Sequence, residues 1–164
     1  MIISTSVNSE VFVCFVMIKY MEEYDKDLYF VAVKVFLRDN NKLLIIHDIF
    51  GDWDLPGGRI KKDEFSISLD SVIHRKIKEE LGDEIHYSKP IQNGVFFRVE
   101  RLEHDLNRNV RIFAVGYEAE YKKGKITLGK HMDDFKWVDI SNFDPKEYFK
   151  GGWLNGVEDY LVTV

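Results

Sequence analysis

One stretch decides how this chain is organised: Leu55-Pro-Gly-Gly-Arg-Ile-Lys-Lys-Asp-Glu64, followed after a spacer by Arg75-Lys-Ile-Lys-Glu-Glu-Leu-Gly82. The Pro-Gly-Gly segment cannot easily continue a strand or a helix, so it predicts a sharp turn. Apolar side chains then recur at helical spacing and predict an amphipathic helix over residues 69–81. Ser68 is a suitable N-cap, and the glycine that closes the stretch lies where a C-terminal glycine belongs.

Two adjacent glutamates lie on or beside the apolar face of that helix. At roughly 100° per residue, Glu80 falls within the apolar stripe and Glu79 lies at its edge. A carboxylate on a buried face is costly unless it is paired or bound to a metal ion. With Glu64 before the helix and a free carbonyl in the turn, these carboxylates would form an oxygen-rich site suited to Mg²⁺ or Mn²⁺. The alternative is an exposed helix end whose glutamate pair is stabilised by Lys76.

The stretch resembles the signature of the Nudix hydrolases, G-x5-E-x7-R-E-U-x-E-E-x-G-U, where U is a large aliphatic residue. The positions that match this signature are Gly58, Glu64, Arg75, Ile77, Glu79, Glu80 and Gly82. There are three departures. The spacer between the first glutamate and the arginine is ten residues instead of seven, Lys76 replaces a glutamate, and Asp83 stands where an aliphatic residue is expected.

The order of the elements along the chain predicts an α/β fold in a single domain. Strands, one helix, further strands and a C-terminal helix suit an α/β/α sandwich around a mixed β-sheet, which the Nudix resemblance also implies. The expected strands are a hairpin at 31–37 and 42–47 and three further strands at 91–101, 110–121 and 135–140. A polar loop at 102–109 would serve as a substrate lip. A short helix is expected from Asp144 to Gly151-Gly152, followed by a terminal helix over 154–162. Residues 28–164 are the expected domain, and residues 1–27 an N-terminal extension.

Composition narrows the class of protein. The chain has 164 residues, a net charge of −5 and a pI near 5.6, which argue for one domain and against a nucleic-acid-binding protein. Its one cysteine allows neither an internal disulfide nor a cysteine metal cage. The apolar run at residues 11–18 is too short to span a membrane, so an edge strand or a dimer contact is expected there, unless the biological start is Met17 or Met21. We expect a cytoplasmic protein without a membrane or nucleic-acid partner, and the resemblance suggests a homodimer.

The resemblance also implies a metal-dependent hydrolase of a nucleoside diphosphate linked to another moiety, with a nucleotide sugar as one candidate substrate. Glu79 and Glu80 would bind Mg²⁺ or Mn²⁺ with help from the carbonyl of Gly57 or its neighbour. Arg75 would hold the carboxylates in place, and Glu64 would orient that arginine. Because a lysine at position 76 repels cations, we expect fewer metal ions than is usual in the family. The alternative is a catalytically impaired Nudix domain that acts as a nucleotide-binding or regulatory module.

A second segment, His131-Met-Asp-Asp-Phe-Lys-Trp137, is the best place to look for a general base. His131 suits that role near neutral pH, and Asp133 or Asp134 could be a further metal ligand or base, or bind substrate. The segment is similar to one in the GDP-mannose mannosyl hydrolases, a Nudix branch in which a histidine is the base.

By that likeness Arg59 would stabilise the departing diphosphate. Met132 is one residue too many for the branch pattern, so a count back from Trp137 would place His131 at a metal-ligand position instead. Trp53 is expected either to pack in the core or to stack on substrate.

Overall fold

The computed structural model describes residues 27–103 and 107–164. Its strands are β1 (Phe30–Asp39), β2 (Lys42–Asp48), β3 (Trp53–Asp54), β4 (Gly57–Arg59), β5 (His86–Tyr87), β6 (Ile91–Glu103), β7 (Arg108–Lys123) and β8 (Met132–Asp139). Its helices are the 3-10 turns η1 (Lys62–Glu64) and η2 (Pro145–Glu147) and the α-helices α2 (Leu69–Leu81) and α3 (Gly151–Leu161). The apolar run at residues 11–18 lies outside the described residues, so the role predicted for it stays a prediction.

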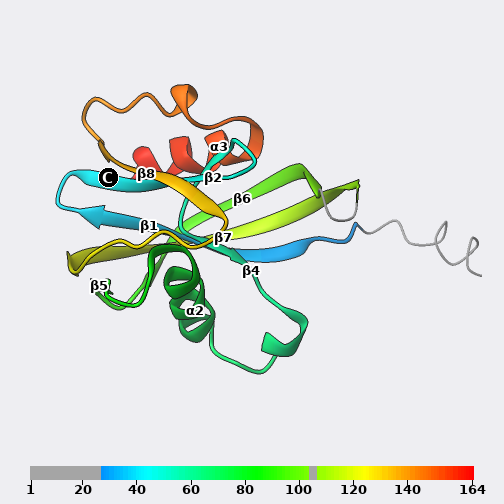
Figure 1. The fold of residues 1–164 in the computed structure, drawn as a ribbon. Helices are drawn as coiled ribbons and strands as arrows, with labels where there is room; N and C mark the ends of the chain where they lie inside the picture. Colours follow the sequence, from blue (N-terminus) through cyan, green and yellow to red (C-terminus); the bar gives the residue numbers. More distant parts are fainter. Residues whose placement is uncertain (1–26, 104–106) are drawn as a thin grey trace, which may run out of the picture.

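The strands form one mixed sheet with a helix on each face, as Figure 1 shows. Strand β1 runs parallel to β7 and antiparallel to β2 and β4. The sheet is extended by β8, which pairs with β2, and by β6, which pairs with β7. The predicted α/β/α sandwich around a mixed sheet is therefore confirmed.

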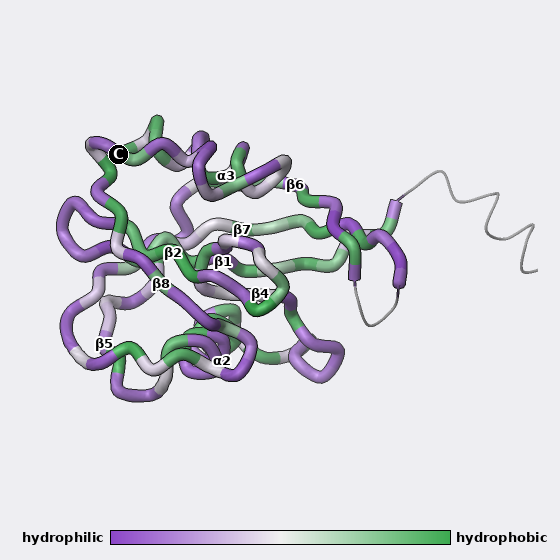
Figure 2. The backbone as a smooth tube through the Cα atoms, turned by 45° about the horizontal axis from the view of Figure 1, so that its top comes forward, coloured by the Kyte–Doolittle hydropathy of each residue, from purple (hydrophilic) through white to green (hydrophobic). Residues whose placement is uncertain are grey.

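Strand β1 is buried on both faces, which explains its nearly continuous apolar sequence. Val33 and Val35 belong to the core under α2, together with Ile73 and Ile77 of that helix. Alternate residues of β1 face the opposite core, where Phe36 stacks on Tyr160 of α3 with ring centroids 4.0 Å apart. In Figure 2 strand β2 includes a strongly hydrophobic stretch, whereas β8 is largely hydrophilic.

Helix α2 covers the residues that were predicted from periodicity. The Ser68 hydroxyl accepts a hydrogen bond from the Ser71 amide at 3.2 Å, and Gly82 closes the helix with φ 89°. Glu80 is buried with the apolar stripe, as the sequence indicates. Within the described residues, no helix is long and apolar enough to cross a membrane.

Two predictions about the second half of the chain were wrong. The expected loop at residues 102–109 is strand at both ends, because Leu102 pairs with Asn109 and Glu103 with Arg108 in the β6–β7 ladder, whereas its role as a substrate lip stays a prediction. Only residues 104–106 of that lip lie outside the described residues. The glycine pair at 151–152 begins helix α3 instead of ending the preceding turn. A Cβ on Gly152 would lie 1.9 Å from the Arg98 carbonyl oxygen, so this glycine permits close packing of α3 on β6.

Candidate active site

The glycine turn and helix α2 meet at Glu80. Strand β4 pairs with β1, which places Gly57 opposite Lys34. Gly57 has φ 138°, and a Cβ there would lie 2.1 Å from the Val33 carbonyl oxygen, so the close approach requires glycine. The Gly57 amide donates to Oε2 of Glu80 at 2.8 Å. Burial raises the pKa of the Glu80 carboxyl, and the ammonium groups of Lys76 and Lys34 act in the opposite direction.

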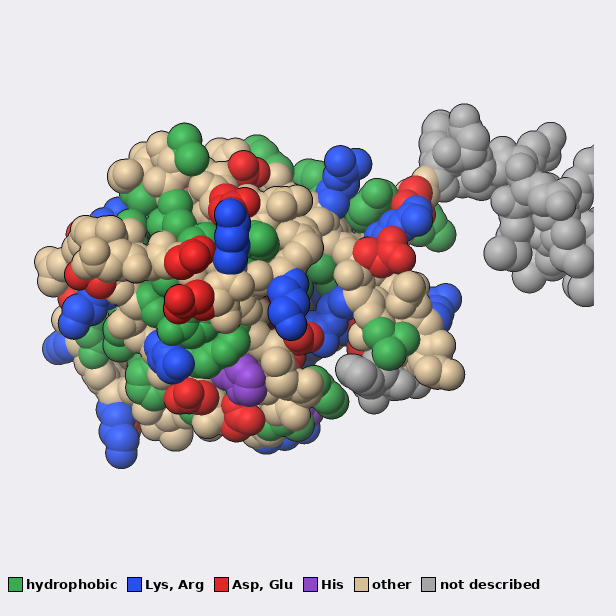
Figure 3. Space-filling view, turned by 90° about the horizontal axis from the view of Figure 1, so that it is seen from above, with side chains coloured by type: hydrophobic (Ala, Val, Ile, Leu, Met, Phe, Trp, Pro, Cys, Tyr) green, Lys and Arg blue, Asp and Glu red, His purple; other side chains and the backbone are tan. Residues whose placement is uncertain are grey.

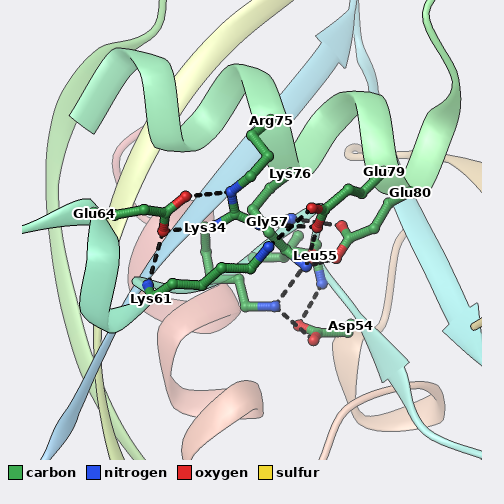
Figure 4. Close-up of polar contacts among 10 residues, drawn as sticks. All are labelled: Lys34, Asp54, Leu55, Gly57, Lys61, Glu64, Arg75, Lys76, Glu79 and Glu80. Atoms are coloured by element: carbon green, nitrogen blue, oxygen red, sulfur yellow. Dashed lines mark hydrogen bonds and ion pairs between the residues drawn. The ribbon is translucent and has the colours of Figure 1, made fainter. Parts of the chain in front are cut away.

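Arg75 joins the glutamate before the helix to the first glutamate of the pair (Figure 4). Its guanidinium donates twice to Glu64, from Nε to Oε1 and from Nη2 to Oε2, the latter at 2.8 Å. Nη1 donates to Oε2 of Glu79 at 2.8 Å. The hydrogen bonds from Arg75 lower the pKa of Glu64. The longer spacer does not break the predicted pair, because exposed residues between turn η1 and helix α2 take up the added length.

The ammonium of Lys76 lies between the two adjacent glutamates (Figure 4). Nζ is 3.0 Å from Oε1 of Glu80 and 3.5 Å from Oε2 of Glu79. Its side chain also lies against the glycine turn, since a Cβ on Gly58 would be 2.4 Å from Cε of Lys76. A cation belonging to the chain therefore occupies the space into which both carboxylates point.

The glycine turn, Lys76 and Glu80 form one wall of a cleft of about 310 Å³. Four basic side chains line it, and each pairs with an acidic side chain that also lines it. The pairs are Lys34–Asp54 at 2.6 Å, Lys76–Glu80 at 3.0 Å and Arg101–Asp48 at 3.9 Å, together with Arg59–Glu103. Figure 3 likewise shows basic and acidic side chains interspersed over one face of the molecule. An anionic ligand could bind by replacing these carboxylates at the guanidinium and ammonium groups.

Several cleft residues were missed from the sequence. Lys34 is the clearest, because it is buried, bonds to the Leu55 carbonyl at 3.1 Å and lies 4.7 Å from the centre of the Trp153 ring. A lysine inside a strand that is apolar on both faces was a signal for a site. Arg101 and Glu103 gave no such signal, since Arg101 ends an expected strand and Glu103 falls in the segment that was expected to be a loop.

The residues predicted from the second segment divide between two places. His131 and Met132 line the cleft, as Arg59 does. Asp133 instead lies 2.6 Å from Nδ1 of His47, and Asp134 accepts a hydrogen bond from the amide of Phe135. Neither aspartate lines the cleft.

A bulge explains this division. In the β2–β8 ladder, His47 pairs with Asp134 whereas Asp48 pairs with Met132, so β8 contains one extra residue at that point. Trp53 also lies outside the cleft. Its ring packs 4.9 Å from His47 and 5.3 Å from Tyr148, which matches the packing alternative.

The donors do not fit the divalent ion that the family resemblance implies. Glu79 and Glu80 already bind Lys76, and Glu79 also bonds to Arg75 and Lys61. In residues 27–103 and 107–164, no three His, Cys, Asp or Glu side chains group closely enough to hold a metal ion. An ion at this place would have to displace an ammonium group.

Comparison with known proteins identifies the family. The NUDIX domain matches residues 28–154, which is more than half of the chain, so the chain belongs to the Nudix family. No curated protein matches it.

Solved structures with the same fold include a MutT protein from Methanosarcina mazei Go1 (20% identity, TM-score 0.63, covering 85% of this chain and 95% of that one). The E. coli dihydroneopterin triphosphate pyrophosphohydrolase is similar at 13% identity (TM-score 0.61, 84% and 100%). An ADP-ribose pyrophosphatase from Streptococcus suis is similar at 15% identity (TM-score 0.57, 83% and 92%). At these identities the likeness concerns the fold.

Proposed function

We propose that this chain hydrolyses a nucleoside diphosphate linked to another moiety, with the diphosphate bound in the cleft beside Glu80. One observation carries the proposal. The Gly57–Glu80 contact and the Arg75 pairs bring the Nudix signature residues together, and Gly58 and Glu80 among them line a cleft with four basic side chains. Membership of a family of hydrolases supports the reaction class.

The basic side chains would bind and screen the substrate. A diphosphate repels an attacking water, and nearby cations reduce that repulsion. Arg59 and Arg101 are suited to phosphoryl oxygens because a guanidinium offers paired donors, whereas the less exposed Lys34 and Lys76 supply point charges. His131 would accept the proton of the attacking water. The water oxygen would bond to one phosphorus as the P–O bond to the bridging oxygen breaks, which gives two phosphate-bearing products. Alternatively, as in the mannosyl hydrolase branch, it would bond to the sugar carbon as the C–O bond breaks, which releases the nucleoside diphosphate.

The substrate class has support from two structural neighbours. One is the ADP-ribose pyrophosphatase and another is named a UDP-X diphosphatase. Both names describe a nucleoside diphosphate that carries a further group, and a nucleotide sugar belongs to the same class. Mg²⁺ or Mn²⁺ is the cofactor that the resemblance implies, but a single ion would reach Glu79 and Glu80 together only after Lys76 moved away.

The second candidate is a Nudix domain that binds a nucleotide without turning it over. The position of Lys76 favours it, because the ammonium neutralises the carboxylates on which metal-assisted water activation would depend.

Product analysis in ¹⁸O-labelled water separates the two candidates. A panel of nucleotide sugars, dinucleotides and nucleoside triphosphates is tested with Mg²⁺, with Mn²⁺ and with a chelator. Wild type is compared with Glu80→Gln and with Glu84→Gln, an exposed glutamate just beyond α2. We expect turnover of a diphosphate derivative by wild type and Glu84→Gln, and its loss in Glu80→Gln.

The label then locates the attack. Label in the phosphate product indicates attack at phosphorus, and label in the sugar indicates attack at carbon. If a panel member binds and none is turned over, the hydrolase proposal fails and the binding module replaces it.

A further inference from the structure

Lys76 is held in its place from two directions. It projects from α2 one turn before the glutamate pair, and its Nζ lies 3.0 Å from Glu80 and 3.5 Å from Glu79. The glycine turn confines it on the other side, since a Cβ on Gly58 would meet Nζ at 2.9 Å. The side chain is only 19% exposed. Its ammonium is therefore a fixed part of the cleft wall.

The surrounding charges oppose a further cation. Glu79 already has Arg75, Lys61 and Lys76 as cationic partners, and Lys34 lies on the same cleft. Two carboxylates that point at one place would ordinarily suit Mg²⁺ or Mn²⁺. Here a divalent ion would have to displace one ammonium and remain close to another.

We propose that Lys76 is the resident cation of this site: its ammonium takes the position between Glu79 and Glu80 that a divalent metal would otherwise occupy, and it keeps Mg²⁺ and Mn²⁺ out of the wild-type cleft. This inference concerns cation binding and does not rest on turnover. It therefore stands or falls separately from the proposed hydrolysis. The lysine that replaces the signature glutamate at position 76 thus has a function of its own, since it supplies positive charge to the cleft without an exchangeable ion.

Titration with Mn²⁺ alone tests the proposal on the full chain. Binding is followed by electron paramagnetic resonance of free Mn²⁺, and thermal unfolding is recorded with and without the ion. The variants are Lys76→Glu, which adds a carboxylate in place of the ammonium, and Lys76→Met, which only removes the ammonium. Lys78→Glu is the matched control, because it makes the same charge change on the same helix at a side chain that is 58% exposed and outside the cleft.

We expect Lys76→Glu to bind Mn²⁺ at least about tenfold more tightly than wild type and Lys78→Glu, because three carboxylates would then converge on one place. Lys76→Met should show a smaller gain in affinity. Mn²⁺ should raise the unfolding temperature of Lys76→Glu by several degrees and leave that of wild type unchanged, since an ion that binds only the folded state stabilises it.

Two results would overturn the proposal. One is wild-type Mn²⁺ binding as tight as that of Lys76→Glu. The other is a gain in Lys76→Glu no larger than the gain in Lys78→Glu. If the repulsion among carboxylates prevents Lys76→Glu from folding, Lys76→Met decides the matter, because it adds no charge. Failure of Lys76→Met to bind more tightly than wild type would then refute the role assigned to Lys76.

Discussion

Helix α2 with its preceding turn and the segment from His131 to Trp137 both stood out in the sequence for their polar chemistry, yet they contribute very differently to the cleft. The first brings Gly57, Lys76 and Glu80 to one wall. In the second, His131 and Met132 line the cleft, whereas the next residue, Asp133, turns to His47.

The difference follows from the geometry of the two elements. On a helix, residues three and four positions apart lie on one face, so Lys76 reaches both glutamates of the pair. Along a strand, successive side chains alternate between faces, and a bulge interrupts even that pattern. Polar residues that lie close together in the sequence therefore predict a shared site better in a helix than in a strand.

Arg75 joins Glu64 to Glu79 at the centre of the signature residues, so its removal should have the greatest effect on stability. Arg75→Ala leaves Glu64, whose side chain is only 7% exposed, without its guanidinium partner. Because an uncompensated buried charge is costly, we expect a loss of about 3 kcal/mol in the free energy of unfolding. Urea unfolding at pH 7 measures it.

Arg111→Ala is the matched control for that experiment. Arg111 also pairs with two carboxylates, Asp27 and Glu100, but its side chain is 51% exposed. We expect a far smaller loss, since exposed ion pairs contribute little. Equal losses in the two variants would show that the pairs around Arg75 are ordinary surface pairs.

The contribution of Glu64 to stability should also depend on pH. The hydrogen bonds from Arg75 lower the pKa of Glu64 in the folded state below its ordinary value of 4.5. The stability that this carboxylate contributes is therefore present above pH 4.5 and is lost as pH falls through the folded pKa. Glu64→Gln should cost about 2 kcal/mol at pH 7, and the difference from wild type should shrink steadily below pH 4.5.

Urea unfolding between pH 3 and pH 7 checks this prediction. Asp63→Asn serves as the control, because this neighbouring side chain is exposed and is not one of the carboxylates that bond to Arg75. A Glu64→Gln difference that stays constant across the range would mean that the ionised form of Glu64 is not the stabilising one.

The sequence was most informative where local rules decide the structure. Periodicity and capping residues predicted α2 correctly, and the same periodicity put Glu80 in the buried stripe. Pairing between distant strands could not be predicted in this way. The Arg101–Asp48 contact joins β6 to β2, and neither residue's neighbours indicate the other. The role of Gly152 was misread because this glycine permits close packing on Arg98 of β6, more than fifty residues earlier in the chain.

The smallest expected effect tests the strand half of the comparison. The hydrogen bond with Asp133 raises the pKa of His47 above its ordinary value of 6.5. A raised folded pKa contributes stability that is fully present below pH 6.5 and is lost as pH rises through the folded pKa. Asp133→Asn should therefore bring the pKa of His47 down in an NMR titration, whereas Asp134→Asn should leave it in place.

Because Asp133 is 51% exposed, the loss of stability in Asp133→Asn at pH 6 should stay below about 1 kcal/mol and vanish at pH 9. Turnover in the Asp133→Asn variant should be unchanged, and a large loss of turnover would show that Asp133 serves the cleft after all.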